Sequence, residues 1–270
     1  MKTTIFLLLF STQVVAQHHT RLNPATIEVH YHHTMQRDTV RRLATETDSM
    51  ILRIGASASQ FFSRHTFYYD SLWNDPDGRA TAEALTLEAF RTRDHSKEPR
   101  VGTTYDYLYK NYPAGRVTTT NEQFHVACRY DEATPSISWV MADSIRTILG
   151  HPCRMATADF RGRRWTAWFA TDIPVSDGPW KLGGLPGLIL EAYDKGHQYT
   201  FIAVGLERVA EEPIVFTRRG GKNGYRTVDR RAFLKAKMFN LTHGGALGAS
   251  GLKSTDYEPV YMDLIERDYR

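Results

Sequence analysis

Residues 188–209 read LILEAYDKGHQYTFIAVGLERV, and this stretch makes the clearest local structural prediction in the chain. Two apolar runs flank the four residues Asp194-Lys195-Gly196-His197. Two strand-forming runs separated by a short turn that contains glycine are typical of a β-hairpin. We therefore predict two neighbouring antiparallel strands, the first of them buried.

The segment just upstream, GPWKLGGLPG at residues 178–187, is crowded with glycine and proline and is called the glycine loop below. Such residues allow backbone conformations that other residues resist, and they permit close approach of a ligand or of another chain segment. The loop lacks the GxGxxG order and no GK[ST] follows it, which argues against a phosphate cradle. We favour a compound turn that places Trp180 and Leu185 against the core. The predicted structural motif comprises Gly178, Pro179, Gly183, Gly184, Pro186 and Gly187.

The remaining chain consists mainly of short strand-like runs. Residues 26–35 alternate with a period of two, and residues 50–63 read as one or two strands with a bend at Gly55. Residues 78–93 and 227–240 have helical patterns, the second with Thr227 as its expected N-cap. Many short strands with few helices predict an α+β fold: a largely antiparallel, curved sheet resembling an open half-barrel, with a few helices packed on one face.

The N-terminus has the layout of a secretory signal peptide. Lys2 is followed by the apolar residues 5–10, and Val14-Val15-Ala16 resembles a cleavage signal. We expect cleavage after Ala16, hence a signal peptide at 1–16, a β-rich domain at 17–212 and a C-terminal connector, helix and flexible tail at 213–270. The expected location is the periplasm or the extracellular space, and no later segment is apolar enough to span a membrane.

The composition bears on the class of binding partner and on whether the cysteines form a disulfide. The net charge of +4 comes from 34 basic and 30 acidic residues, so the sequence does not indicate nucleic-acid binding. The 41% hydrophobic content suffices for a substantial core. Only Cys128 and Cys153 are present, and an even pair in an exported protein favours a disulfide over separate thiols or a metal pair.

Residues 153–194 read CRMATADFRGRRWTAWFATDIPVSDGPWKLGGLPGLILEAYD. This text closely resembles the GLPGLI family of exported bacterial proteins, named for the string at residues 184–189. The stretches MILRIGASASQFFS and DEATPSISWVM, at 50–63 and 131–141, are also similar to that family. The resemblance extends from about Met50 to Val209, whereas the part after Pro213 matches only loosely.

The resemblance implies export and one β-rich domain. It supplies no catalytic residues, because no biochemical function is established for the family. In architecture alone, the predicted sheet is also similar to the open half-barrels of periplasmic lipoprotein carriers, which hold acyl chains in a concave sheet covered by helices.

The candidate binding residues are aromatic and basic residues in and near the glycine loop. We expect Trp168, Trp180 and Leu185 to line the edge of a concave surface, with Arg163 beside it, because arginine with aromatic rings can bind carboxylates, phosphates or sugars. The alternative is that the tryptophans belong to the core and that Arg163 caps a turn.

A metal site is a second hypothesis. His30 and His32 lie two residues apart on one predicted strand, so both imidazoles point to the same face and could chelate Zn²⁺ or Cu²⁺. Glu28 is the only further ligand that the sequence suggests. Solvated strand histidines are the competing interpretation.

Hydrolysis is a third hypothesis and has the weakest support. Ser57, Ser59, Ser250 and His243 are the available residues, but no GxSxG elbow surrounds any serine. We therefore predict a non-enzymatic binding or carrier protein without a cofactor. Its expected partner is a small apolar ligand, a peptide or a cell-envelope protein.

Overall fold

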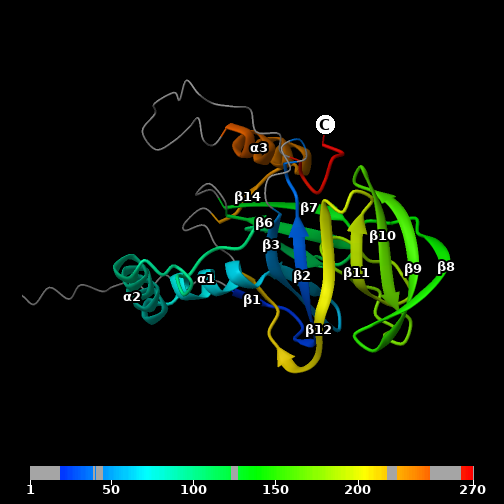
Figure 1. The fold of residues 1–270 in the computed structure, drawn as a ribbon, viewed down its shortest axis with the longest axis horizontal. Helices are drawn as coiled ribbons and strands as arrows, with labels where there is room; N and C mark the ends of the chain where they lie inside the picture. Colours follow the sequence, from blue (N-terminus) through cyan, green and yellow to red (C-terminus); the bar gives the residue numbers. More distant parts are fainter. Residues whose placement is uncertain are drawn as a thin grey trace, which may run out of the picture.

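A computed structural model of the chain describes residues 19–38, 40, 45–122, 127–217, 224–243 and 263–269. It contains one open, curved sheet of 12 strands and a small two-stranded sheet (Figure 1). The α+β fold with a largely antiparallel curved sheet is thereby confirmed.

The large sheet is antiparallel at every strand pair except one. Its order is β14 (Arg226–Thr227), β7 (Cys128–Ala133), β6 (Arg116–Asn121), β5 (Tyr107–Lys110), β4 (Ser59–Ser63), β3 (Glu46–Gly55), β2 (Ala25–Met35), β12 (Tyr199–Glu212), β11 (Leu188–Asp194), β10 (Arg163–Ala170), β9 (His151–Phe160) and β8 (Val140–Ile148). Only β14 and β7 run parallel. Neighbours in this order are mostly neighbours in sequence, as expected for hairpin connections.

The predicted hairpin is confirmed as β11 and β12. Ala192 lies opposite Phe201, and the backbone N–H of His197 donates to the carbonyl of Asp194 across the turn at 2.8 Å. The expected bend at Gly55 is confirmed as the turn that joins β3 to β4. A side chain at Gly55 would meet the carbonyl oxygens of Asn23 and Pro24 at 2.8 Å each, so this turn requires glycine.

The small sheet pairs β1 (His19–Arg21) with β13 (Val215–Thr217) and packs on the outside of the large sheet. Phe216 of β13 contacts the ring of Tyr109 on β5 at 4.9 Å between centroids. The Tyr109 hydroxyl donates to the carbonyl of Val215 at 3.2 Å.

Two faces of the sheet are distinguished from here on. The inner face is concave and carries Val29, Leu52, Phe61 and Trp165, all buried in the main core. The outer face is the opposite one. The alternation predicted for residues 26–35 is confirmed, since Val29, Tyr31 and His33 are buried whereas His32 is exposed.

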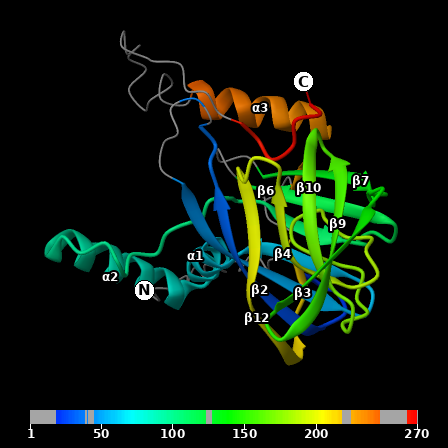
Figure 2. The same ribbon diagram turned by 45° about the vertical axis from the view of Figure 1, so that its right-hand side comes forward.

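Three helices in the described part of the chain complete the fold. Helix α1 (Arg64–Asn74) begins directly after β4 with Ser63 as its N-cap and packs on the outer face of β3 and β4. Helix α2 (Pro76–Thr92) continues from α1 and extends away from the sheet (Figure 2). The sequence predicted α2 but not α1.

Helix α3 (Arg230–His243) lies across one end of the curved sheet, near β7 (Figures 1 and 2). The predicted helix is confirmed, but its predicted N-cap is wrong. Asp229 rather than Thr227 is the cap, because its carboxylate accepts from the backbone N–H of Ala232 at 3.0 Å. Thr227 instead lies in β14.

The C-terminal segment 263–269 is held in place by buried ion pairs. The expectation of a loose tail is wrong for these residues, since Leu264, Glu266 and Tyr269 are all buried. Lys181 of the glycine loop pairs with Glu266 at 2.6 Å and also with Glu132 of β7. Arg161 and Arg163 bind Asp268 and Asp263 of the same segment, and Arg230 binds both Glu266 and Asp268. Residues 244–262, the rest of the predicted tail, lie outside the described residues.

Candidate functional site

The glycine loop fills the concave side of the sheet. Trp180, Leu182 and Leu185 are each at most 6% exposed and belong to the main core. The indole ring of Trp180 packs against Trp165 and Phe160, with ring centroids 5.6 Å apart in both cases. The predicted turn, with Trp180 and Leu185 against the core, is what the structure contains.

Close packing explains two of the glycines, Gly178 and Gly187. A Cβ atom at Gly187 would lie 2.1 Å from the carbonyl oxygen of Ala170, and one at Gly178 would lie 2.8 Å from Ile189. Gly184 has a φ of +82°, in the left-handed region. The carbonyl of Pro179 accepts from the backbone N–H of Leu182 at 3.0 Å, and that of Gly183 accepts from the Trp139 indole at 2.8 Å. Pro186, between Leu185 and Gly187, is exposed.

The residues proposed to line a binding edge are buried. Trp168 is 8% exposed, and the Arg146 guanidinium covers its ring at 4.1 Å. Arg163 has a fully buried side chain that binds Asp194 at 2.7 Å and Asp263 at 2.9 Å. Together with Trp180 and Leu185, these residues form the core and its ionic border, so none of them presents an open binding surface. Arg163 fixes the C-terminal segment to β10 instead of capping a turn.

The two cysteines do not form a disulfide in this structure. Cys128 and Cys153 are free thiols, located on β7 and β9. These strands lie near opposite ends of the sheet order, which separates the residues that the even count had paired.

His30 and His32 share the outer face of β2, as their spacing predicted. His30 lies 3.1 Å from Glu28 and 3.7 Å from Glu207, whereas His32 is exposed. Across the described part of the chain, no three His, Cys, Asp or Glu side chains come together in a way that could hold a metal ion.

His33, which the sequence did not single out, is the buried histidine of this strand. Its ring stacks on Phe201 at 4.2 Å, and its Nδ1 lies 2.7 Å from the carbonyl oxygen of Thr200. Burial lowers the pKa of His33 to about 4, so the ring is neutral at physiological pH.

The serines proposed for hydrolysis have structural partners. Ser59 donates to the carboxylate of Asp177 at 2.6 Å, and Ser57 donates to Asn23. His243 ends α3, and Ser250 lies outside the described residues. No described histidine bonds to Ser57 or Ser59, so the structure does not assemble the predicted nucleophile and base.

Cavities occur on both sides of the sheet. An inner cavity of about 80 Å³ lies beneath α3 and is lined by His33, Trp180 and Phe201 among others. Sites for drug-sized ligands usually measure about 300–1,000 Å³. The inner cavity is therefore too small for an acyl chain of the kind that the half-barrel analogy suggested. A cleft of about 390 Å³ also lies between the β3–β4 turn and the glycine loop.

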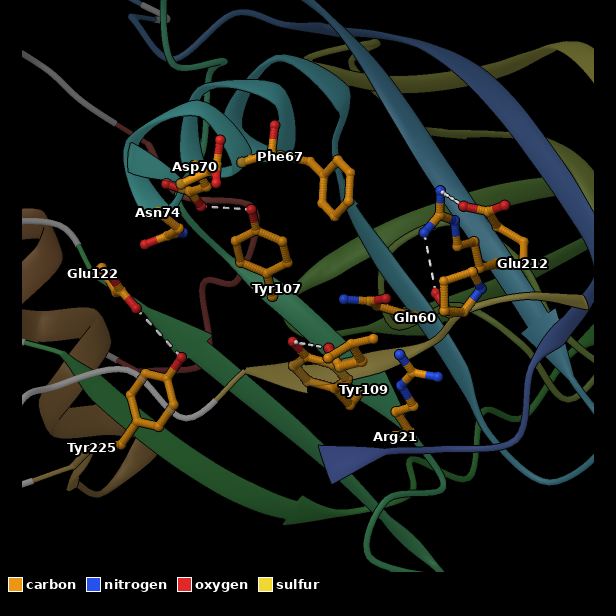
Figure 3. Close-up of a pocket in the computed structure, with 15 residues that line it drawn as sticks. Arg21, Gln60, Phe67, Asp70, Asn74, Tyr107, Tyr109, Glu122, Glu212 and Tyr225 are labelled. Atoms are coloured by element: carbon orange, nitrogen blue, oxygen red, sulfur yellow. Dashed lines mark hydrogen bonds and ion pairs between the residues drawn. The ribbon is translucent and has the colours of Figure 1, made fainter. Parts of the chain in front are cut away.

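The largest of these spaces, about 410 Å³, lies on the outer face and is called the outer cavity below (Figure 3). Its floor is a row of side chains set by strand register, because Arg53 of β3 lies opposite Gln60 of β4, which lies opposite Tyr109 of β5. Tyr107 projects from β5 on the same face. Helix α1 supplies one wall and the β1–β13 sheet supplies another.

Most polar groups around the outer cavity already have partners. The Tyr107 hydroxyl donates to Asp70 of α1 at 2.6 Å. Arg53 pairs with Glu28 at 2.8 Å and Glu212 at 2.7 Å, and its guanidinium lies 5.3 Å from the ring centroid of Phe67. These contacts hold the walls in fixed positions.

Gln60 and Arg21 differ from these groups. Gln60 is only 3% exposed, yet its amide forms no hydrogen bond with any residue that the structure describes. Arg21, at the end of β1, also reaches into the cavity without an ion pair or hydrogen bond in the described ranges. The amide atoms of Gln60 are not among the buried side-chain atoms that lack a partner, so water in the cavity reaches them, and the Arg21 side chain is exposed. Figure 3 shows both side chains in the same space as the Tyr107 and Tyr109 rings.

The sequence carries only a weak signal for this site. SQFF at 59–62 and YLYK at 107–110 are short runs rich in aromatic residues, and a strand sends such side chains to both of its faces. Without the strand order, however, nothing indicated that Gln60 and Tyr109 would be cross-strand neighbours.

Comparisons with known proteins give a limited result. A family model described as a protein of unknown function (Porph_ging) matches residues 161–191. This short match agrees with a GLPGLI-type family without confirming that name. A search of curated proteins found no match.

Among solved structures, two crystal forms of PNGF-II are similar to this chain. They have TM-scores of 0.49 and 0.48 with 12% sequence identity, and the matches cover 78% and 79% of this chain. The chain spans only 32% of the length of either structure. In the described part of the chain, no helix is both long and apolar enough to span a membrane.

Proposed function

We propose that this chain is an exported binding protein that takes a small ligand in the outer cavity. The observation that carries the proposal is a cavity of about 410 Å³ with aromatic walls, into which Gln60 and Arg21 project without a hydrogen bond or ion pair to any described residue. Aromatic walls with a few convergent polar groups are typical of small-molecule sites. The site therefore moves from the concave face, where the sequence analysis placed it, to the outer face.

Enzymatic activity has less support than binding. The outer cavity contains neither a serine with an adjacent base nor a described metal cluster. Arg53 and Tyr107 are held by their partners, which suits a preorganised binding site.

Binding at the outer cavity can be tested with the fluorescent probe 8-anilinonaphthalene-1-sulfonate. Ser71 lies on α1 at the cavity, so Ser71→Trp should occupy the space without changing the main core. We expect saturable probe binding to the native protein and a loss of at least about tenfold in affinity in this variant. Ser144→Trp, an exposed serine on β8, is the matched control and should bind like the native protein. Equal binding by both variants would contradict the proposal.

Export is tested separately. The full chain should be recovered outside the cytoplasm with Gln17 as its first residue, as N-terminal sequencing of the exported protein would show. Recovery of uncleaved chain in the cytoplasm alone would remove the exported location but leave the cavity untouched. Native mass spectrometry of gently purified protein would reveal a ligand that co-purifies.

A further inference from the structure

Helix α2 has two sides with opposite surroundings. Ala82 and Ala89 are buried, whereas Leu87 and Phe90 on the other side are 69% and 80% exposed. Residues three and four positions apart share one side of a helix, so two exposed alanines lie in line with these large side chains. Figure 2 shows α2 projecting from the body of the protein. The exposed apolar residues of this side are called the α2 stripe: Ala80, Ala84, Leu87 and Phe90.

The shape of the α2 stripe suits another helix. Contiguous exposed apolar side chains mark surfaces that bind a further macromolecule. Leu87 and Phe90 stand out from the helix, whereas Ala84, one turn before them, leaves room for a large side chain beside it. A second helix with the same pattern, running in the opposite direction, would therefore place its large side chains over the small ones of the first.

The charges beside the stripe have opposite signs at its two ends. Glu83 lies one turn before Leu87 and Arg91 lies one turn after it, both on the exposed side of the helix. Glu83 forms no ion pair within the described part of the chain. Arg91 pairs there with Glu88 of its own helix at 2.7 Å, and both of these side chains are more than half exposed. An exposed pair of this kind contributes little, so Arg91 remains free to bind a second carboxylate.

We propose that α2 is a dimerisation surface and that it pairs with α2 of a second copy of this chain. The two helices run antiparallel about a two-fold axis at Leu87. Phe90 then packs over the partner subunit's Ala84, and Glu83 meets the partner subunit's Arg91. Each of these contacts occurs twice, because a two-fold interface joins the same patch of both subunits.

The charges select this arrangement over two others. A parallel pair of helices would bring each Glu83 to the other Glu83 and each Arg91 to the other Arg91, so that like charges repel. A membrane surface is a poorer match, since helices that lie on membranes are rich in lysine and arginine. Helix α2 instead carries three acidic residues, Asp77, Glu83 and Glu88, against the two arginines 79 and 91.

The size of the helix sets the expected strength of the dimer. A helix of 17 residues is about 25 Å long, so one pair of such helices buries less surface than a standard protein interface. We therefore expect a reversible dimer with a dissociation constant in the micromolar range.

Sedimentation velocity of the purified chain over a range of concentrations measures this equilibrium. Leu87→Lys keeps a good helix former but places two ammonium groups at the two-fold axis, so it should weaken the dimer by at least about tenfold. The matched control is Ile145→Lys on β8, at a side chain that is 72% exposed, and it should dimerise like the native protein. Far-UV circular dichroism should show the same helix content in both variants.

Exchanging the charges tests the direction of the helices. Glu83→Arg and Arg91→Glu should each weaken the dimer several-fold, because each change creates two contacts between like charges. The double variant restores opposite charges at both contacts and should recover most of the lost affinity. A change that merely damaged the helix would not be rescued in this way.

Several results would overturn the proposal. One is a native protein that stays monomeric at several hundred micromolar, and another is a dimer that Leu87→Lys leaves intact. A dimer lost in Ile145→Lys but kept in Leu87→Lys would place the interface on the exposed edge strand β8. A double charge variant no tighter than the two single variants would reject the antiparallel pairing of α2.

Discussion

The two faces of the sheet place their polar groups in different surroundings. On the inner face, Lys181, Arg163 and Glu266 are buried and each is bonded to opposite charges or carbonyl groups. On the outer face, Gln60 is equally buried but has no described partner. A charge paired inside the core stabilises the fold, whereas the Gln60 amide faces a cavity that water reaches and can bond to a ligand there. The contrast identifies the inner face as structural and the outer face as the candidate site.

The glycine loop illustrates why the inner face is not the site. Lys110 holds the loop by donating to the Asp177 carboxylate at 2.6 Å, and also to the Gly178 carbonyl. The concave space that resembles a ligand-binding half-barrel is occupied by the protein's own side chains.

The largest effect is expected from Lys181→Met. Burial alone would lower the pKa of Lys181, but the neighbouring Tyr130, Glu266 and Glu132 raise it, so the ammonium is charged. Removing it leaves two buried carboxylates without this partner, which should lower the free energy of unfolding by about 3–5 kcal/mol. Urea denaturation measures the change. Arg164→Met, which breaks an exposed pair with Asp159, should lose at most about 1 kcal/mol. Similar losses in both variants would remove the distinction between buried and exposed pairs.

His33 gives the inner face a dependence on pH. Its pKa in the folded protein is about 4, below the ordinary 6.5, so the unfolded chain takes up the proton first as the pH falls. The contribution of neutral His33 to the free energy of unfolding is therefore fully present above about pH 6.5. It is lost as the pH falls towards 4, by on the order of 3 kcal/mol in total. His33→Gln should flatten this part of the pH–stability curve.

The control for His33 is its neighbour on the same strand. His32 is exposed, and His32→Gln should leave the slope between pH 6.5 and pH 4 unchanged. A slope that persists in His33→Gln would assign it to other groups.

A smaller loss is expected from Gly187→Ala. The added methyl group would lie 2.1 Å from the Ala170 carbonyl oxygen, so the backbone must shift, at a cost of about 1–3 kcal/mol. At Gly183 the nearest atom to an added Cβ is 3.5 Å away, and Gly183→Ala should be neutral or slightly stabilising. Thermal denaturation of Gly187→Ala and Gly183→Ala measures the two effects. Equal losses in both variants would show that every glycine of the loop is required, and not only those in close contact.

The smallest effect on stability, and a large one on binding, is expected from Gln60→Leu. This change removes a buried amide that lacks a described partner, so the free energy of unfolding should stay within about 1 kcal/mol of the native value or rise slightly. Probe binding at the outer cavity should weaken in the same variant. A marked loss of stability would show that Gln60 is structural, and the contrast between the two faces would fail.

Local patterns allowed part of the fold to be predicted. The alternation in residues 26–35 identified the buried face of β2, and the glycine-containing turn after Asp194 identified the hairpin. Helix α1 was missed because its sequence, RHTFYYDSLWN, is rich in aromatic residues that favour strands as strongly as helices. Its decisive feature is the N-cap at Ser63, whose hydroxyl accepts from the Thr66 N–H at 3.2 Å.

The candidate site was not predictable in the same way. Trp168 and Arg163 were predicted to bind a ligand because one is aromatic and the other is basic. Both are buried, because burial and pairing depend on which strands are neighbours in the sheet. Gln60 was not predicted as a site residue, since a glutamine in a strand has no distinctive local pattern.

By itself the sequence determined the fold class, the hairpin and the turn made by the glycine loop, because these depend on backbone preferences and on periodicity over a few residues. Only the tertiary structure decided which groups are partnered. Arg163 meets Asp263 a hundred residues away, and Gln60 meets Tyr109 across a strand pair, by contacts that no local pattern encodes. A cavity such as the one beside Gln60 can therefore be recognised only from the tertiary structure.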